Sequence, residues 1–277
     1  MHNIRLVCRD VLDFCQCKVS YVGGSMVPDP QRLQTAMSLY SQQLSALLLL
    51  VDDKFEVQNN NGTKRNFVRI CNESTEFHFP TYEKQVCVIE QALQDRGPRR
   101  KSLRSGSLQK QTQLPQVAQP PQEVNKSSPP LQTGDFYITK HSNLAEVHAV
   151  LHLVTDNTVT SGTINSRHAI IIGVRNLMLA AARHNITNIV VPLLLVHEME
   201  GHMTLQWCLK RAELVLKCVK GFMMESLSWD GHESRTLQFV VPTGVSEETF
   251  VAFSNMLPSI FRVSNPLDLS SLTGKSN

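Results

Sequence analysis

The chain has 277 residues, of which 42% are hydrophobic and 18% are charged, and its formal net charge is +3. This length allows one large domain or two of ordinary size. The apolar content excludes a chain that is disordered throughout, and the small net charge excludes a protein that is polycationic as a whole.

The seven cysteines follow no disulfide pattern, because their number is odd and their spacing is irregular. Residues 1–10 carry Arg5 and Arg9 with no apolar core between them, unlike a signal peptide. The longest apolar run near the amino terminus, Ala46–Val51, is too short to cross a bilayer. These features predict a cytosolic protein without a transmembrane segment.

The first part of the chain, Met1–Gln94, opens with apolar segments. Val11–Val22 is mostly apolar and predicts a strand that ends before two glycines. From Pro30 to about Leu47, apolar side chains recur every three or four residues, which predicts an amphipathic helix. Leu47–Val51 either completes this helix or begins a strand.

Turn residues and short apolar runs fill the rest of this part. Asn61-Gly62 is a strong hairpin signal, and Phe67–Cys71 and Glu76–Phe79 are candidate strands. Thr81–Leu93 has helical spacing, with Thr81 as the N-cap. We therefore expect residues 1–94 to form an α/β half with few strands of its own.

Asp95–Gly134 differs sharply in composition. It contains six prolines, many Ser, Gln and basic residues and few large apolar side chains, so it cannot bury enough surface to offset its ordering entropy. We predict a disordered, basic and Pro-rich linker, which is too long for an ordered loop. It is either an insertion into one sheet or a tether between two domains. We favour the insertion, with both halves sharing one core.

Basic residues cluster at the start of this linker. Six of them fall within fifteen residues, without an acidic residue among them. Basic residues before a serine suit protein kinases, and the charge could also attract RNA or an acidic membrane surface. The absence of aromatic residues weakens the RNA hypothesis, and a solvated linker remains the alternative. The candidate basic or phospho-regulatory residues are Arg99, Arg100, Lys101, Ser102, Arg104, Ser105 and Ser107.

Strands and helices alternate from residue 135 to residue 262. The expected strands are Phe136–Thr139, Val147–Val154, Asn188–Val196 and Leu237–Val241, and the expected helices are His168–His184, Leu205–Met224 and Ser246–Leu257. This order predicts an α/β fold of three layers, with a mixed, mostly parallel sheet and helices on both faces. The most apolar strand, Asn188–Val196, should be central. The polar residues 263–277 are predicted to form a flexible tail.

The sharpest candidate for a metal site is the run His197-Glu198-Met199-Glu200-Gly201-His202. Zinc proteases place two histidines four residues apart on one helix face, with a glutamate as the base. Here the histidines are five apart, so a helix would turn them roughly 140° away from each other. The run also follows a strand and contains Gly201, which indicates a loop. We expect no metal here.

Other chemical motifs are weak. Cys15 and Cys17 are one residue apart rather than two, and His148 and His152 share a strand face without a carboxylate partner, so both pairs are interpreted as structural. No phosphate-binding glycine loop and no nucleophile elbow is present in the sequence. We therefore expect no catalytic residue, no cofactor and no enzymatic activity.

The predicted helix Leu205–Met224 is apolar on two sides. One side forms an unbroken apolar stripe, and a second stripe consists of Trp207, Leu214 and Cys218. A helix that is apolar on two sides is buried on both. Either it lies between the sheet and another layer of the same fold, or the second stripe meets a partner protein.

Several longer stretches resemble one family. They are T-K-H-S-N-L-A-E-V-H-A-V-L-H at Thr139–His152, V-P-L-L-L-V within Ile189–Val196, W-C-L-K-R-A-E-L-V-L-K-C-V-K-G-F-M-M-E at Trp207–Glu225, and the run N-M-L-P-S-I-F-R-V-S at Asn255–Ser264. On these residues the chain is similar to the third subunit of the FERRY endosomal Rab-effector complex. Members of that family are about twice as long, so the resemblance implies a carboxyl-terminal portion or a short form.

The resemblance implies a non-enzymatic adaptor in a five-protein assembly. An activated Rab GTPase recruits that assembly to early endosomes, and the assembly binds mRNA for long-distance transport. The implied partners are the other subunits, the Rab GTPase indirectly and mRNA through the complex, and mast-cell degranulation is also linked to the family. The implied location is the cytoplasm, peripherally on early endosomes.

A more distant likeness is to macro domains, which bind ADP-ribose. Asn185–Leu195 resembles their strand before the phosphate loop. The following run differs, because it holds Glu198, Glu200 and a single glycine where a pyrophosphate would lie. A macro-like module that binds or hydrolyses ADP-ribose or a related nucleotide is therefore the alternative to the adaptor.

Overall fold

The structure is a computed structural model that describes residues 2–16, 19–22, 25–28, 44–55, 62–74, 76, 78–104, 131–142, 144–160, 164–230 and 235–261. Its strands are β1 (His2–Cys8), β2 (Val19–Val22), β3 (Ser25–Pro28), β4 (Leu44–Val51), β5 (Phe136–Lys140), β6 (Ala149–Val154), β7 (Ile186–Pro192) and β8 (Arg235–Val241). Its α-helices are α2 (Gly62–Glu73), α3 (Tyr82–Arg104), α4 (Ala169–Arg183), α5 (Leu205–Asp230) and α6 (Glu247–Phe261). Two short 3-10 helices are η1 (Val11–Phe14) and η2 (Asn157–Val159).

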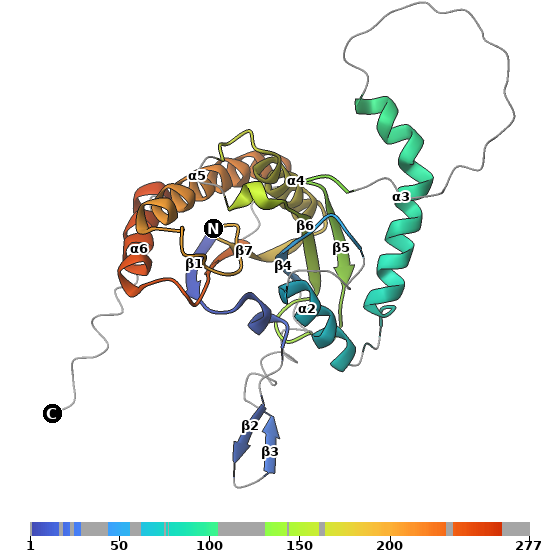
Figure 1. The fold of residues 1–277 in the computed structure, drawn as a ribbon, viewed down its shortest axis with the longest axis horizontal. Coiled ribbons are helices and arrows are strands. Elements are labelled where there is room, and N and C mark those ends of the chain that lie inside the picture. Colours follow the sequence, from blue (N-terminus) through green and yellow to red (C-terminus); the bar gives the residue numbers. More distant parts are fainter. Residues whose placement is uncertain are drawn as a thin grey trace, which may run out of the picture.

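Six strands form one mixed sheet in the order β1-β8-β7-β4-β6-β5 (Figure 1). All neighbours are parallel except β5, which runs antiparallel to β6. The first 94 residues supply β1 and β4, so β4 lies between β7 and β6 from the later part of the chain. The strands β2 and β3 form a separate antiparallel pair.

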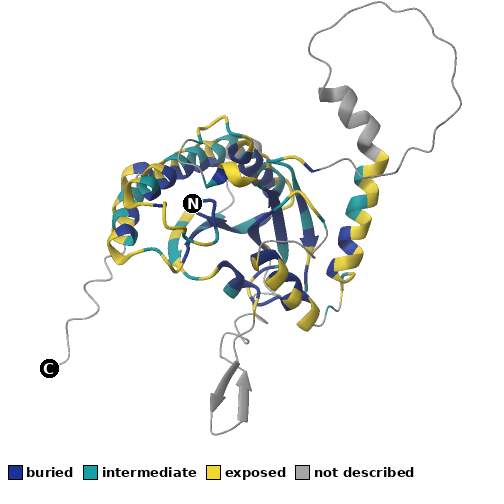
Figure 2. Ribbon diagram, viewed as in Figure 1, coloured by how far each residue is buried: buried dark blue, intermediate teal, exposed yellow. Residues whose placement is uncertain are grey.

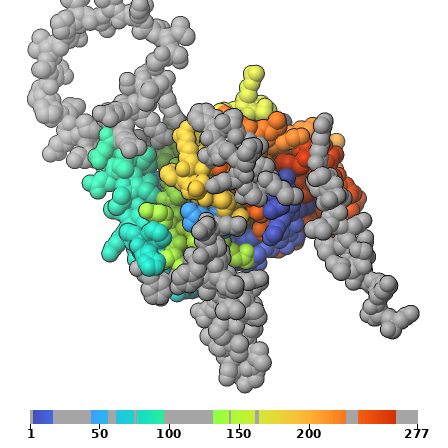
Figure 3. Space-filling model, turned by 180° about the vertical axis from the view of Figure 1, so that it is seen from behind, coloured from blue at the N-terminus to red at the C-terminus, as the bar shows by residue number. Residues whose placement is uncertain are grey.

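Side chains of β4 alternate between two cores. Leu48 and Leu50 pack in a cluster with residues of α4, α5 and α6, whereas Leu47 and Leu49 pack with residues of η1, α2 and α3. The helices therefore cover both faces of the sheet, and buried residues line the strands between them (Figure 2). Seen from behind, α3 lies on one flank and α5 and α6 on the other (Figure 3). The predicted three-layer α/β fold is confirmed.

The structure corrects three predictions in the first part of the chain. The strand expected at Val11–Val22 is η1 followed by the shorter β2, and β1 at His2–Cys8 was missed. The hairpin at Asn61-Gly62 and the strand at Phe67–Cys71 were wrong, because α2 begins at Gly62 and includes Phe67–Cys71. The buried residues of α2 recur every three or four positions, which outweighs the β-branched side chains in that run.

Other element boundaries also differ. The helix expected from Pro30 to Leu47 was wrong from Leu44 onward, because β4 begins at that residue. The earlier part of the expected helix lies in residues 29–43, which are outside the described part. No described residue of the expected strand Glu76–Phe79 belongs to a strand. The strand β7 ends at Pro192, although the N–H of Leu193 still donates to the carbonyl oxygen of Val240 at 2.8 Å. The chain turns at Leu193 and Leu194, and Leu195 has a φ of +55°, which is not an extended conformation.

The close approach of α4 to the turn before β5 depends on two glycines. Gly134 has a φ of +87°, and a Cβ there would lie 2.4 Å from the carbonyl oxygen of Ala169. A Cβ on Gly173 would lie 2.7 Å from the carbonyl oxygen of Gly134. Both positions therefore require a residue without a side chain, which fixes the first turns of α4 against this turn.

None of the helices in the described ranges is long and apolar enough to span a membrane.

Candidate functional site

A cleft opens where three central parallel strands end. Its lining comes from the carboxyl end of β4, from the start of α2, from η2 after β6, and from the turn after β7, and its volume is about 450 Å³. Ligands of open α/β sheets bind at this edge, in the crevice outside the carboxyl ends of the strands. The topology therefore identifies this cleft as the place where a bound molecule would be expected.

Carboxylates dominate the polar lining of the cleft. Asp52, Asp156, Glu198 and Glu200 line it, and the adjoining depression of about 610 Å³ adds Asp53. A pyrophosphate placed here would meet like charge in a partly desolvated site. The charge of the lining therefore disfavours phosphates.

Asp52 has a cationic partner. The Nζ of Lys64 lies 3.0 Å from Oδ1 of Asp52 and also donates to the carbonyl oxygen of Lys54. The Lys64 side chain is wholly buried, while the Asp52 side chain remains 31% exposed. Burial of this ammonium is tolerable only because it is paired, so Asp52 is needed for the fold as well as for the charge of the cleft.

His197 is locked into the wall of the cleft. The backbone N–H of Leu50 donates to its Nε2 at 3.0 Å, so its proton lies on Nδ1. Nδ1 is buried and has no hydrogen-bond partner among the residues that the structure describes. Burial lowers the pKa of His197 to about 4, so the ring is neutral at physiological pH.

His202 lies apart from this arrangement. It is exposed, its ring nitrogen Nε2 lies 3.0 Å from the carbonyl oxygen of Thr160, and its Nδ1 lies 3.4 Å from the carboxylate of Glu200. The run His197–His202 is a loop, as predicted, because β7 ends before it and α5 begins after it. Within the described ranges, no three His, Cys, Asp or Glu side chains are grouped so that they could hold a metal ion.

Arg211 joins two walls of the cleft. Its guanidinium donates to the carbonyl oxygens of Val159 at 2.6 Å and Leu194 at 3.2 Å, and it lies over the ring of Trp207 at 4.5 Å. The side chain is buried, and burial lowers its pKa to about 10, which still leaves it charged. One side chain from α5 therefore sets the distance between η2 and the turn after β7.

Sequence reasoning missed the cleft, although the sequence carries a signal for it. The strands β4 and β6 each end in a valine that is followed within two residues by a carboxylate, at Val51-Asp52 and Val154-Thr155-Asp156, and the segment after β7 repeats this pattern at Val196-His197-Glu198. In parallel neighbours the carboxyl ends meet at one edge of the sheet. This repetition would have placed the three acidic residues together.

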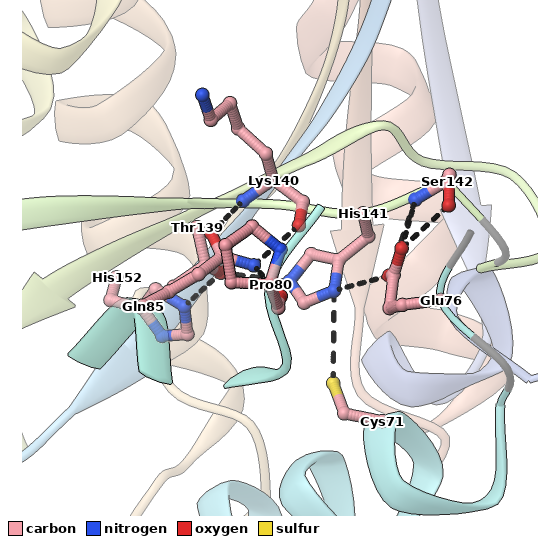
Figure 4. A network of polar contacts seen from close by, with 9 residues as sticks. All are labelled: Cys71, Glu76, Pro80, Gln85, Thr139, Lys140, His141, Ser142 and His152. Atoms are coloured by element: carbon pink, nitrogen blue, oxygen red, sulfur yellow. Dashed lines mark hydrogen bonds and ion pairs between the residues drawn. The ribbon is translucent and has the colours of Figure 1, made fainter. Parts of the chain in front are cut away.

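A buried polar network lies on the α2–α3 face of the sheet (Figure 4). The hydroxyl of Thr139 contacts Nε2 of His141 at 2.8 Å and Nε2 of His152 at 2.9 Å. Nδ1 of His141 lies 3.2 Å from Glu76, whose carboxylate accepts from Ser142. The Gln85 side chain bonds both backbone groups of Lys140, so α3 covers the outer edge of β5.

This network stabilises the fold and does not position a reacting group. Cys71 lies 4.0 Å from Nδ1 of His141, an arrangement that resembles a nucleophile and its base. Burial, however, raises the pKa of the Cys71 thiol, so the thiolate is absent near neutral pH. Burial likewise lowers the pKa of His152, which stays neutral.

The remaining residues that the sequence analysis interpreted as structural are His148, Cys15 and Cys17. His148 accepts a hydrogen bond from the backbone N–H of Ser45 at 3.1 Å, and burial lowers its pKa. Cys15 is buried, and burial raises the pKa of its thiol. Cys17 lies outside the described residues.

The predicted interaction stripe lies on α5. Trp207, Leu214 and Cys218 are all half-buried and pack against the core between the sheet and α4, α5 and α6. The guanidinium of Arg211 already lies over the ring of Trp207. The ring centroid of Trp207 lies 6.5 Å from that of His202. Leu214 and Cys218 retain partial exposure, so a partner role for this stripe remains a proposal.

The predicted basic segment begins on α3. The helix extends to Arg104, so the first ten residues of the expected linker, Asp95–Arg104, have helical backbone. This range includes the candidate residue Ser102. Ser105 and Ser107 lie outside the described residues, as does the rest of the linker up to residue 130. The regulatory role of this segment therefore stays a prediction.

Comparison with known proteins gives consistent results. Residues 1–267 match the family model of "Ferry endosomal RAB5 effector complex subunit 3". The proteins of that name from Homo sapiens and Mus musculus are each 47% identical over 271 residues, which cover 98% of this chain and 48% of the relative. The chain therefore spans about half the length of the curated relatives it matches.

Among solved structures, a mutant macrodomain from Oceanobacillus iheyensis with ADPR aligns with 90% of this chain and all of its own, at 10% sequence identity and a TM-score of 0.41. The matched family model covers both parts of the chain, including β1 and β4 as well as the later strands and helices. This chain therefore belongs to the family of subunit 3 of the Ferry endosomal RAB5 effector complex.

Proposed function

We propose that this chain is a non-enzymatic adaptor subunit of an endosomal Rab5 effector complex, and that the assembled complex links mRNAs to early endosomes for transport. The observation that carries the proposal is the 47% identity to subunit 3 proteins over 98% of this chain, together with a family match at residues 1–267 that includes the whole sheet and the helices on both faces. Its direct partners would be the other subunits, with the Rab GTPase and mRNA reached through the complex.

The chemistry of the described residues supports an adaptor more than an enzyme. The thiols of Cys15 and Cys71 have raised pKa values, and His152 and His197 are buried and neutral. These groups are engaged in packing and hydrogen bonds within the fold. The acidic cleft also opposes the alternative, a module that binds or hydrolyses ADP-ribose.

The surface of α5 supplies a candidate subunit contact. Leu214 and Cys218 are both half-buried and lie on one side of α5. Apolar residues that remain accessible on a helix already packed on its sheet are typical of protein interfaces. We propose that this side of α5 contacts another subunit.

Reconstitution with the other purified subunits tests the adaptor role. Wild-type chain should co-elute with them, and messenger RNA should be recovered with the assembly and not with the isolated chain. Leu214→Glu should weaken assembly by about thirtyfold, the effect of losing an interface anchor. The matched control is Val88→Glu, the same kind of change at a 67% exposed residue of α3, which should assemble normally.

Two outcomes would contradict the proposal. Failure of the wild-type chain to bind any subunit would remove the adaptor role. Loss of the native circular dichroism signal in isolated Leu214→Glu would show that this leucine belongs to the core, so that the contact must lie elsewhere.

A further inference from the structure

The two edges of the six-stranded sheet differ. At one edge, the side chain of Gln85 on α3 bonds both backbone groups of Lys140, so a helix covers the outer side of β5. At the other edge, β1 pairs with β8 alone, and no further strand of the described ranges lies beside it. Seen from behind, the first residues of the chain lie at the surface beside α6 (Figure 3). An open edge presents a row of N–H and C=O groups on which another strand can form.

One hydrogen bond fixes the direction of the backbone groups on β1. The N–H of Arg9 donates to the carbonyl oxygen at the end of β8 at 3.2 Å. The backbone groups of successive residues alternate in direction along a strand, so the N–H groups of Arg5 and Val7 also point toward β8. The N–H and C=O groups of Ile4 and Leu6 therefore point toward the open edge, where no strand of the described ranges pairs with them.

The strand β1 lacks most of the features that block pairing at an edge. It has seven residues, its register with β8 is continuous from His2 to Cys8 without a bulge, and it contains neither proline nor lysine. Exposed edge strands are commonly shortened, bulged or supplied with such residues. A strand of this length and regularity is therefore suited to accept another strand.

The two faces of β1 define the kind of strand that fits beside it. Ile4 and Leu6 are half-buried and pack against the core between the sheet and α4, α5 and α6. Phe261 at the end of α6 is also half-buried, and its ring centroid lies 6.3 Å from that of Phe239, the register partner of Leu6. On the opposite face of β1, Arg5 is exposed. A matching strand would place apolar side chains beside Ile4 and Leu6 and an acidic side chain beside Arg5.

We infer that the open edge of β1 is a docking site for an extended segment of a partner protein in which apolar and acidic residues alternate. Main-chain hydrogen bonds to Ile4 and Leu6 hold the segment, and its side chains supply the specificity, as in other complexes formed by strand addition. This inference rests on the proposed function, because the segment would belong to another subunit. It adds a second contact surface to the one proposed on α5.

The charge of Arg5 disfavours a second copy of this chain as the occupant. When two β1 strands pair antiparallel in full overlap, from His2 to Cys8, Arg5 of one copy lies directly opposite Arg5 of the other. Like charges directly opposite each other destabilise a pair of strands. A segment with an acidic residue at the same position gains an attractive pair instead, so charge complementarity selects the acidic partner.

Titration of two synthetic peptides into the purified chain tests the inference. The acidic peptide is acetyl-Thr-Val-Glu-Val-Glu-Val-Thr-amide, and the basic peptide has lysine in place of each glutamate. Amide hydrogen exchange followed by NMR should show that the acidic peptide protects the N–H groups of Ile4 and Leu6. Those of Arg5 and Val7 point toward β8 and should be protected with or without peptide. The basic peptide should bind about tenfold more weakly, because it brings like charge to Arg5.

A charge exchange locates the contact. Arg5→Glu should reverse the preference, so that the basic peptide binds about tenfold more tightly than the acidic one. Arg65→Glu, the same change at an exposed arginine of α2, should keep the preference of the wild type. Because both arginines are exposed, both variants should fold normally.

Backbone methylation of the acidic peptide distinguishes strand addition from a contact made by charge alone. One version carries N-methyl groups on its three valines, and the other carries them on its two glutamates and its last threonine. Only one of these two sets of N–H groups can point toward β1 in a strand. One version should therefore lose binding, and the other should retain it.

Equal affinity of the two methylated versions, or an unchanged preference in Arg5→Glu, would overturn the inference. So would protection of Ile4 and Leu6 in the chain without peptide. Such protection would assign the edge to a second copy if it rises with the concentration of the chain, and to another segment of the same chain if it does not.

The outcome is separable from that of the proposed function, which depends on co-elution of the wild-type chain with the other subunits. If the chain co-elutes with them and the acidic peptide protects neither Ile4 nor Leu6, the adaptor role stands and the inference fails. If the acidic peptide protects both residues and no subunit co-elutes, the adaptor role fails and the docking edge stands.

Discussion

The hydroxyl of Thr139 lies 2.9 Å from Nε2 of His152, in a part of the core where both side chains are fully buried. The same hydroxyl contacts Nε2 of His141, although it has only one proton to donate. If His141 donates from Nδ1 to Glu76, its Nε2 must accept from Thr139, and His152 must then donate to Thr139. One hydroxyl therefore sets the tautomer of both rings.

Replacing Thr139 by valine should destabilise the fold by about 1–3 kcal/mol, because two buried imidazoles would each lose a hydrogen bond without solvent to replace it. Thr139→Ser keeps the hydroxyl and should lose less than about 1 kcal/mol. Urea unfolding of both variants measures the difference. Equal stability of the two would show that the methyl group, and not the hydroxyl, is what the core requires.

Stability should fall below neutral pH because of His197. Its pKa is about 4 in the folded chain and about 6.5 when unfolded, so the unfolded chain takes up the proton first. The contribution is complete above about pH 6.5 and is lost as the pH falls toward 4, by roughly 3 kcal/mol. His197→Gln, whose amide oxygen can still accept from Leu50, should show a shallower decline between these values in thermal melts. An unchanged slope would exclude His197 as the source.

Arg211 should be intolerant even of lysine. A lysine cannot contact the carbonyls of Val159 and Leu194 and lie over Trp207 at the same time, so Arg211→Lys should cost about 1–3 kcal/mol. The same change at Arg175, whose guanidinium pairs with Glu225 on a solvent-accessible face, should cost less than about 1 kcal/mol. Chemical denaturation compares the two. A larger loss at Arg175 would contradict the role assigned to Arg211.

Two helical glycines should respond to alanine in opposite directions. At Gly173 a Cβ would lie 2.7 Å from the carbonyl oxygen of Gly134, so Gly173→Ala should destabilise the chain by about 1–3 kcal/mol through overpacking. At Gly221 a Cβ meets nothing within 4 Å, so Gly221→Ala should stabilise α5 by about 0.5–1 kcal/mol. Calorimetric melting of both variants provides the check, and shifts of the same sign would contradict the packing at Gly134.

The sequence determined the layered α/β architecture, because long apolar strands that alternate with amphipathic helices can be buried in few other ways. The central position of β7 followed from the apolar run Ile189–Leu195, which is too apolar for a strand with one face in water. The sequence did not determine α2. The run Phe67–Cys71 is equally suited to a short strand by composition, and only its burial against β4, η1 and α3 selects the helix.

The tertiary structure alone decided which polar groups meet. In the sequence, Asp52 is more than one hundred residues from both Asp156 and His197. The three residues come together because β4 lies between β6 and β7 in the sheet. Thr139, His152 and Glu76 meet for the same reason, across β5, β6 and the segment after α2. Periodicity reports which side of an element is buried, whereas the partner of a buried polar group depends on strand order, and strand order is set by the packing of the whole core.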